Sequence, residues 1–261
     1  MHRLLVIAGS DSSAGAGIQA DLKTAQAFGV YAQTAITAVT AQDTKGVHAV
    51  EALPPGTVRQ QIKAALGDIG ADAIKIGMLG NGAIAAAVAD ALQHIALPLV
   101  LDPVLVSSSG RVLLDADGIA VLKSRLLPRT FLVTPNWPEC EALIGIRPDS
   151  DAAMEDAAKA FARLGVPNLL IKGGHGTGAT VRDALFGTGG ERSIFESPRQ
   201  ITRHTHGTGC VLSTAIACGL ARRKPLADTV RLAHDFVQHA LRTAPGLGSG
   251  HGPLNLGAKY P

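Results

Sequence analysis

Short apolar runs alternate along the chain with longer segments in which hydrophobic residues recur at helical spacing. The apolar runs predict strands over residues 3–8, 33–39, 73–76, 97–102, 131–134 and 168–172. The periodic segments predict helices over about residues 16–28, 57–68, 82–94, 116–126, 138–144, 151–164, 210–221 and 227–243. This alternation indicates right-handed crossovers and a mostly parallel sheet with helices on both faces.

The last third of the chain departs from this alternation. Residues 180–186 and 192–195 predict a hairpin around the glycine-rich turn at 187–190. Residues 246–261 are rich in Gly and Pro and predict a loosely packed tail. Because there is no internal repeat and no long linker, residues 1–261 indicate one domain.

Composition narrows the class of protein. The chain has 261 residues, 46% hydrophobic and 17% charged, so it can bury a sizeable core without disulfides or metals. No apolar run approaches the roughly 18 residues of a membrane helix, and the first residues turn polar too early for a signal peptide. The three cysteines cannot all pair in disulfide bonds, which favours the reducing cytoplasm as the location of the protein. A net charge of +3, one Trp and two Tyr argue against a nucleic-acid partner.

Polar residues follow several predicted strands at the point where each strand ends. Gln42 follows the second strand, and Asp102, Asn136 and Lys172 stand at the ends of the last three parallel ones. In an open parallel sheet, ligands bind at the carboxyl ends of the strands. We therefore expect a site at this edge.

A glycine-rich loop with the residues His206, Gly207, Thr208, Gly209 and Cys210 precedes a predicted helix of small residues. Its glycines allow the backbone to approach a ligand, and the first helical N–H groups attract an anion such as a phosphoryl group. At this helix start the Cys210 thiol is expected to have a lowered pKa and to serve as a base or nucleophile. The alternative is a plain turn with a buried thiol.

The residues at the strand ends allow two interpretations each. Asn136 and Glu139 open a predicted helix, where the carboxylate could organise water around Mg²⁺ and the amide could reach a phosphate. From the residues alone, an ordinary helix cap is the favoured explanation of both, because this arrangement is very common. Asp102 is either a cap or a second acid of the metal site. Lys172 either neutralises phosphate charge or extends its ammonium group to solvent.

The first glycine-rich loop fits the dinucleotide-binding fingerprint only formally, since six residues separate the predicted strand from Gly15. A phosphate-loop motif of the type G-x-x-x-x-G-K-[ST] does not occur. Asp21, one turn into the following helix, is either a solvated acid or a ligand for a substrate hydroxyl group.

Seven segments follow one another in a distinctive order: GSDSSAGAGIQADLKT (9–24), TAVTAQDT (37–44), KIGML (75–79), DPV (102–104), TPNWPE (134–139), KGGH (172–175) and THGTGC (205–210). Together they resemble the hydroxymethylpyrimidine/phosphomethylpyrimidine kinases of thiamine biosynthesis, a family of the ribokinase-like superfamily. The resemblance spans about residues 3–252. It implies a three-layer α/β/α sandwich and a kinase that uses ATP and Mg²⁺.

The resemblance also implies two phosphorylations, first of 4-amino-5-hydroxymethyl-2-methylpyrimidine and then of its monophosphate, and a homodimer, which is common in the superfamily. Carried over by motif, the pyrimidine would meet Asp21, Gln42, Met78, Val104 and the backbone of Ala16. The phosphates would meet Asn136, Lys172, Gly207, Thr208 and Gly209, Asp102 and Glu139 would serve Mg²⁺, and Cys210 would be the base.

The chain departs from the family pattern at four positions. Ser12 stands in place of a usual Pro, Ala14 in place of Gly, and Val211 in place of Thr. Ser108 stands where a flap lysine is common, which concerns how the flap meets ATP. None of the four removes a proposed ligand.

Three alternatives remain at this point. Some pyridoxal kinases share the fold and the Gly-Thr-Gly-Cys loop, although they often carry a flap cysteine that residues 106–110 lack. A hydrolase or acyltransferase could use Cys210 with His206, but it leaves Glu139 and Lys172 unexplained. A vitamin-binding protein without catalytic activity needs no phosphate cradle.

Overall fold

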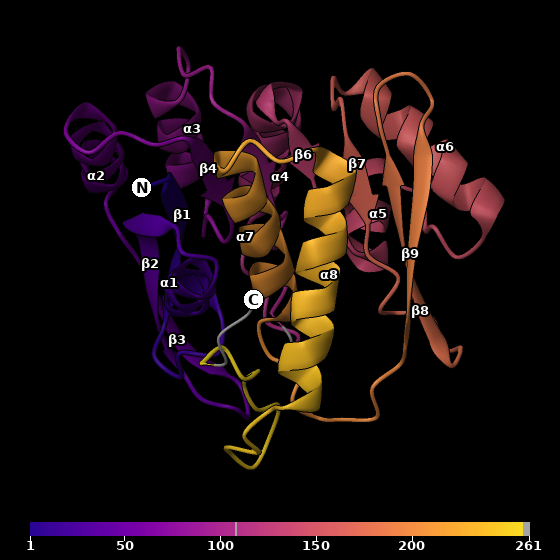
Figure 1. Cartoon of the computed structure of the whole chain (residues 1–261). Coiled ribbons are helices and arrows are strands. Elements are labelled where there is room, and N and C mark those ends of the chain that lie inside the picture. The colour runs from indigo at the N-terminus through magenta and orange to yellow at the C-terminus, as the bar shows by residue number, and fades with distance from the viewer. Residues whose placement is uncertain (108, 258–261) are drawn as a thin grey trace.

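A single sheet organises the computed structural model, which describes residues 1–107 and 109–257. Over these residues nine strands pair in the order β3-β2-β1-β4-β5-β6-β7-β8-β9 (Figure 1). The strands are β1 (Arg3–Asp11), β2 (Tyr31–Gln42), β3 (Val47–Ala52), β4 (Ala73–Ile76), β5 (Leu99–Leu101), β6 (Leu132–Val133), β7 (Leu169–Ile171), β8 (Thr180–Phe186) and β9 (Arg192–Pro198). The six strands from β2 to β7 in this order are parallel, and β3, β8 and β9 add antiparallel edges.

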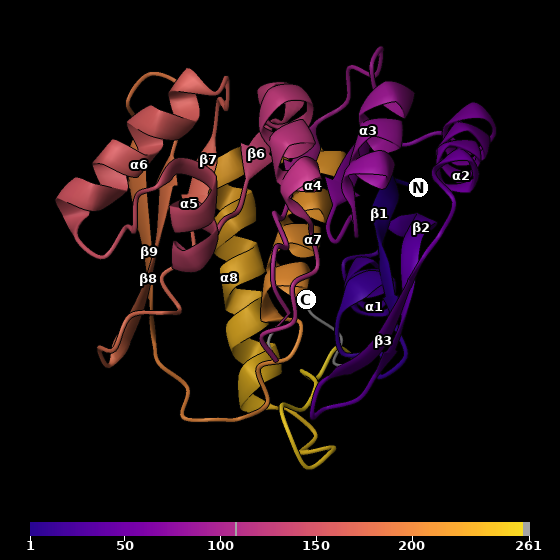
Figure 2. The same ribbon diagram turned by 180° about the vertical axis from the view of Figure 1, so that it is seen from behind.

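Helices cover both faces of the sheet. Figures 1 and 2 show α1, α7 and α8 on one face and α2 to α6 on the other. The helices are α1 (Gly17–Ala27), α2 (Pro55–Gly67), α3 (Gly82–Ala91), α4 (Ala116–Val121), α5 (Trp137–Ile144), α6 (Asp151–Arg163), α7 (Thr208–Ala221) and α8 (Leu226–Arg242). Two separate hydrophobic clusters fill the two interfaces. The expected three-layer sandwich with a mostly parallel sheet is confirmed.

Helix α7 is the most deeply embedded element of the front layer. All of its residues from Val211 to Ala221 are buried. Small side chains let neighbouring helices approach closely: a Cβ at Gly219 would overlap the side chain of Thr229 on α8. Its rigid packing fixes the direction in which the start of α7 points, toward the carboxyl ends of the parallel strands.

Two features differ from the sequence-based expectations. Strand β3 is absent from them, because its residues are exposed or half-buried on both faces and carry no alternating pattern. The segment 116–126, expected as one helix, is α4 followed by a wider π-helical turn at Leu122–Leu126, and a 3₁₀ turn containing Pro128 follows. Proline lacks the N–H group that a continuing helix needs.

The expectation of a loosely packed tail is wrong for residues 251–256. Leu254 and Leu256 are buried in the cluster between the sheet, α7 and α8. The Asn255 amide donates to the Ala240 carbonyl at 3.1 Å, and the His206 amide donates to the Gly252 carbonyl at 3.2 Å. Apolar burial and backbone pairing outweigh the flexibility suggested by Gly and Pro, and they hold the tail beside the 206–210 loop.

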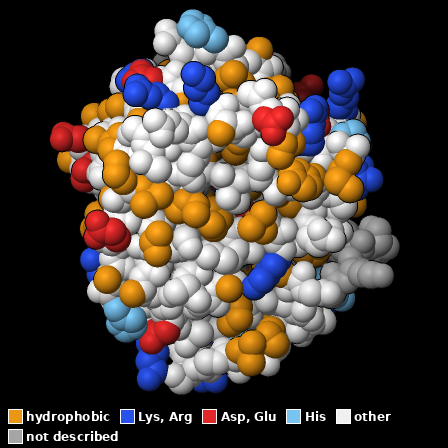
Figure 3. All heavy atoms as spheres, turned by 90° about the vertical axis from the view of Figure 1, so that its left-hand side faces the viewer, with side chains coloured by type: hydrophobic (Ala, Val, Ile, Leu, Met, Phe, Trp, Pro, Cys, Tyr) orange, Lys and Arg blue, Asp and Glu red, His pale blue; other side chains and the backbone are white. Residues whose placement is uncertain are grey.

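The surface beside the β3 edge is comparatively apolar. Tyr31 and Val39 on β2 are 48% and 46% exposed. Figure 3 shows this side of the molecule, with hydrophobic side chains across its middle and most charged ones nearer its margins. Within residues 1–107 and 109–257, no helix combines the length and apolar composition needed to cross a membrane.

Candidate active site

One cavity of about 530 Å³ lies along the carboxyl ends of the parallel strands. Its volume falls within the range of small-molecule sites. Twelve of the thirteen residues singled out from the sequence line it: Ala16, Gln42, Met78, Asp102, Val104, Asn136, Glu139, Lys172, Gly207, Thr208, Gly209 and Cys210. The thirteenth, Asp21, does not. Ser108, at the flap, lies outside the described residues.

The loop before α7 requires glycine for two different reasons. Gly207 caps the helix with φ of +82°, and a Cβ there would overlap the Gly15 carbonyl of the first loop. A Cβ at Gly209 would lie 3.2 Å from Lys172 Nζ and 3.3 Å from Asp102 Oδ2. No side chain caps this helix start. The Thr208 amide donates to the Thr205 carbonyl at 3.3 Å. The other N–H groups of the first turn lie at the cavity wall and suit an anion.

A compact group of charges stands next to this helix start. Lys172 Nζ lies 2.7 Å from Asp102 Oδ1 and 3.7 Å from Glu139 Oε2. Glu139 also accepts a hydrogen bond from the Asn136 amide at 2.7 Å, while the Asn136 side chain accepts from the Glu139 amide at 2.9 Å. This capping box confirms the structural interpretation of the pair. It also holds both side chains at the cavity wall.

Burial and the neighbouring charges shift the pKa values of Glu139 and Lys172. Burial raises the pKa of Glu139 to about 7, and Asp102 adds to the rise while Lys172 opposes it. Burial lowers the pKa of Lys172, but the two carboxylates outweigh it and the net shift is upward. Lys172 is therefore a firmly protonated cation at neutral pH, whereas Glu139 exchanges its proton near neutrality.

Asp21 lies behind the cavity wall, which corrects the expectation of a direct substrate contact. Its side chain is completely buried, and its oxygens bind Lys75 Nζ at 2.8 Å and Thr214 Oγ1 at 2.6 Å. Of this pair only Lys75, itself fully buried, contributes to the lining of the cavity. Sequence reasoning missed its role, although a single lysine within the apolar strand β4 was a usable signal.

Cys210 occupies the expected place at the start of α7, but its expected low pKa is wrong for the ligand-free site. Burial raises the pKa of the thiol to about 11, and Asp21 and Asp102 add to the rise. Lys75 and a backbone hydrogen bond from Gly17 oppose it without reversing it. The sequence shows the helix N-terminus, but not the two carboxylates that the fold brings close.

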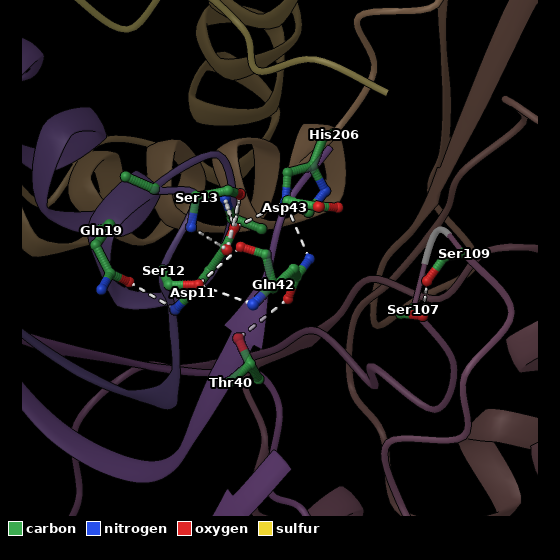
Figure 4. Close-up of polar contacts among 12 residues, drawn as sticks. Asp11, Ser12, Ser13, Gln19, Thr40, Gln42, Asp43, Ser107, Ser109 and His206 are labelled. Atoms are coloured by element: carbon green, nitrogen blue, oxygen red, sulfur yellow. Dashed lines mark hydrogen bonds and ion pairs between the residues drawn. The ribbon is translucent and has the colours of Figure 1, made fainter. Parts of the chain in front are cut away.

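The opposite end of the cavity holds a network that joins distant parts of the chain (Figure 4). Asp11, at the end of β1, accepts hydrogen bonds from the amides of Ser13 at 2.8 Å and Ala16 at 2.9 Å. It also lies 2.7 Å from His206 Nε2, which in turn lies 3.2 Å from Gln42 Nε2. Asp11 and His206 were not among the expected binding residues. The described residues contain no hydrogen bond between His206 and Cys210, so nothing supports a Cys-His hydrolase.

Known proteins resemble this chain over nearly its whole length. The family model described as phosphomethylpyrimidine kinase matches residues 11–255. The hydroxymethylpyrimidine/phosphomethylpyrimidine kinase of Haemophilus influenzae is 44% identical over 98% of this chain and 96% of its own length. The chain spans about half of a thiamine biosynthesis bifunctional protein of Geobacter sulfurreducens, at 43% identity.

Solved structures give the same result. A phosphomethylpyrimidine kinase from Clostridium difficile superposes with a TM-score of 0.82 at 38% identity, covering 92% of this chain and all of that one. A pyridoxal kinase from Staphylococcus aureus in complex with pyridoxal reaches 0.90 at 32% identity, covering 99% and 94%. The fold is thus shared by phosphomethylpyrimidine kinases and pyridoxal kinases. The sequence identity is higher with the first of these two structures. This chain belongs to the phosphomethylpyrimidine kinase family.

Proposed function

We propose that this enzyme transfers phosphoryl groups from ATP to 4-amino-5-hydroxymethyl-2-methylpyrimidine and then to the resulting monophosphate. One observation carries the proposal. A single cavity joins a phosphate cradle, made by Lys172 and the start of α7, to a pocket lined by Gln42, Met78 and Val104. Family membership supports the pyrimidine as substrate.

The phosphate end provides positioning and charge, which are the main needs of phosphoryl transfer. The N–H groups at Gly207–Gly209 and the Lys172 ammonium group would hold the phosphates of ATP. Asn136, fixed by its capping box, would contact them from α5. Because Lys172 already lies between Asp102 and Glu139, an incoming phosphate would replace one of its carboxylate contacts.

Asp102 and Glu139 fit a magnesium ion held mainly through water. Mg²⁺ usually keeps several waters and takes few protein ligands, so a cage of three or more acidic or His side chains is not required. The described residues contain no such cage. When bound, Mg²⁺ would neutralise phosphate charge. Since a metal ligand must be deprotonated, binding would release the proton that Glu139 keeps near neutrality.

The acceptor hydroxyl group would lie next to the Cys210 thiol, which is beside Lys75. In the first reaction an alcohol must lose its proton, and the thiolate form of Cys210 could take it. With the thiol pKa at about 11, the proton transfer depends on Lys75, whose charge favours the thiolate. In the second reaction the acceptor is a phosphate that needs no base. Lys75 would then stabilise the charge of the monophosphate.

The pyrimidine would lie between Met78 and Val104 and meet the backbone of Ala16. Met78 is half-buried, and its sulfur lies close to Gly9, where a Cβ would come within 2.9 Å of it. Gln42 supplies the polar contact at the ring edge. Asp21 contributes indirectly, by fixing Lys75.

Pyridoxal phosphorylation is the second candidate, because pyridoxal kinases superpose with TM-scores of 0.89 and 0.90. An assay of ATP consumption with the hydroxymethylpyrimidine, its monophosphate and pyridoxal tests both proposals. We expect turnover of both pyrimidines that requires Mg²⁺, with much slower turnover of pyridoxal. Preference for pyridoxal would overturn the substrate assignment, and no ATP consumption would overturn the kinase proposal.

Assembly and location follow as lesser proposals. We infer a cytoplasmic homodimer whose interface includes the apolar surface at the β3 edge. Tyr31 and Val39 would be buried in it. Light scattering after size-exclusion chromatography tests this: Val39→Lys should shift the protein to monomer, and an unchanged dimer would exclude this surface.

A further inference from the structure

The side-chain amide of Gln42 is held from both sides. Its Nε2 lies 3.2 Å from His206 Nε2, and its Oε1 lies 3.2 Å from Thr40 Oγ1 (Figure 4). Its backbone is fixed as well, since its amide donates to Ser12 Oγ at 2.8 Å and its carbonyl accepts from Ser12 Oγ at 2.7 Å. Ser12 stands where the family usually has a proline, which could not make these bonds. The position of the side-chain amide is therefore fixed. Which of its two ends is the oxygen and which is the nitrogen depends on its two side-chain neighbours.

The first neighbour, His206, cannot accept a hydrogen bond from Gln42. The Asp11 carboxylate accepts bonds from the Ser13 amide, the Ser13 hydroxyl group and the Ala16 amide. Three such donors favour the ionised carboxylate, which only accepts. The 2.7 Å contact between Asp11 Oδ2 and His206 Nε2 therefore requires a hydrogen on Nε2. Nε2 then has no lone pair in the ring plane with which to accept a bond from Gln42, and its one hydrogen, directed mainly to Asp11, can be shared only with an oxygen of Gln42.

The second neighbour, Thr40, independently requires the same orientation of the Gln42 amide. Its hydroxyl group has one proton, and the Ser10 carbonyl at 3.0 Å can only accept it. The contact to Gln42 is longer, at 3.2 Å, so the Thr40 oxygen is left to accept. The accepting Thr40 oxygen needs an N–H group of Gln42 opposite it. The His206 nitrogen, which carries a hydrogen, needs the oxygen of Gln42 opposite it, since a second N–H group there would be repelled.

Because amide oxygen and nitrogen are assigned from the hydrogen bonds around them, both neighbours favour the orientation with Oε1 toward His206 and Nε2 toward Thr40. We propose that Asp11, His206 and Thr40 are positioning residues that fix this orientation of Gln42, so that its free edge selects a ring nitrogen beside an amino group. This inference rests on the proposed function and adds the origin of its substrate preference.

The chemistry of the edge matches the 4-aminopyrimidine. The second hydrogen on Gln42 Nε2 donates to the ring nitrogen, and the second lone pair of Oε1 accepts from the amino group. This is the pairing that glutamine makes with the corresponding edge of adenine. A 4-oxopyrimidine presents the reverse pattern, an N–H group beside a carbonyl, and would place like groups opposite each other. A freely turning amide would accept both compounds.

The test compares two ligands by titration calorimetry with the full chain: 4-amino-5-hydroxymethyl-2-methylpyrimidine and its 4-oxo counterpart. The wild type should bind the amino compound about tenfold to a hundredfold more tightly. His206→Leu removes the donor and should bring the two dissociation constants close together. His206→Gln, which can place an N–H group near the position of Nε2, should keep most of the preference. Circular dichroism and thermal unfolding report whether each variant is folded, because His206 adjoins the Gly207–Gly209 loop and ADP affinity is not an independent control there.

The outcomes separate the two proposals. If the wild type binds neither compound, the proposed function fails. If the wild type has the preference and folded His206→Leu keeps it, or loses both affinities equally, the positioning role is contradicted. If His206→Leu does not fold, the same ratio is read in Thr40→Val, which removes the acceptor on the other side. Its preference should also fall, with Thr40→Ser as the conservative control, and an unchanged ratio would contradict the inference.

Discussion

The two ends of the cavity recognise their ligands by different means. At the start of α7, the Lys172 ammonium group lies within 4 Å of both the Asp102 and the Glu139 carboxylates at the cavity wall. At the β2 end, the Asp11 carboxylate is engaged by His206 and by backbone amides, and the oriented side-chain amide of Gln42 faces the ligand. Charges suit a phosphoryl group, whose own charge redistributes during transfer. Neutral hydrogen bonds suit an uncharged ring, because an unpaired buried charge is costly.

The largest effect is expected from removing the cation at the charged end. Lys172→Met should lower kcat/KM about a thousandfold, since it deletes a group that stabilises the transferring phosphoryl group. It should also destabilise the fold by about 3 kcal/mol, because it leaves buried carboxylates unpaired. Steady-state kinetics and thermal unfolding measure the two effects. Lys172→Arg is the matched control that keeps the charge, and near-normal turnover by the Met variant would refute the phosphate-binding role.

Cys210, between the two ends, should matter for one reaction more than the other. Cys210→Ala should slow phosphorylation of the hydroxymethyl compound about a hundredfold or more, the usual contribution of a general base. Phosphorylation of the monophosphate should fall much less. The wild-type rate of the first reaction should also rise toward alkaline pH, because the thiol pKa is about 11, and the variant should lose this rise. Equal losses in both reactions would remove the base role.

Glu139 should make stability depend on pH. Its pKa is raised from 4.5 to about 7 by burial, so between these values the folded chain binds more protons than the unfolded chain. The free energy of unfolding should therefore fall as pH rises through this window, by on the order of 3 kcal/mol.

Denaturant titrations from about pH 4.5 to 7.5 measure this slope. Glu139→Gln should flatten it, whereas Glu141→Gln, an exposed position on the same helix, should leave it unchanged. If the pH dependence is unchanged in Glu139→Gln, a group other than Glu139 binds the proton.

The smallest effect is expected at the neutral end, from Ser12. Ser12→Ala removes two hydrogen bonds to the Gln42 backbone and should raise the KM for the pyrimidine several-fold, with little change in kcat. The KM for ATP should not change. Ser124→Ala removes an exposed hydroxyl group that bonds only its own helix region, and serves as the control. An unaltered pyrimidine KM in Ser12→Ala would show that the backbone contact is dispensable.

The contrast between the two ends of the cavity also explains which residues of the site could be predicted from the sequence. Asp102, Asn136 and Lys172 stand directly after apolar strands, and the parallel order brings strand ends together without further information. Helices α6 and α8 were predictable because their apolar periodicity is strong, whereas the exposed strand β3 has no such pattern. The residues of the charged end can therefore be recognised from the sequence alone.

The neutral end is hidden from sequence reasoning for a physical reason. Asp11 and His206 are 195 residues apart and meet only because the tail at Leu254 packs beneath the loop that carries the histidine. Likewise, the partner of Asp21 on α1 is Lys75 on β4. The high pKa of Cys210 depends first on burial and then on the carboxylates of Asp21 and of Asp102, which follows β5. Pairings and desolvation of this kind come from tertiary packing, which local pattern does not contain.

The most direct test of one cavity serving both phosphorylations is a time course with the purified protein, Mg²⁺, excess ATP and the hydroxymethylpyrimidine, followed by phosphorus NMR. The monophosphate should appear first and then give way to the diphosphate, with one ADP released at each step. Lys172→Met should slow both steps together. Accumulation of the monophosphate as the final product, or no phosphorylated pyrimidine at all, would contradict the proposed two-step kinase.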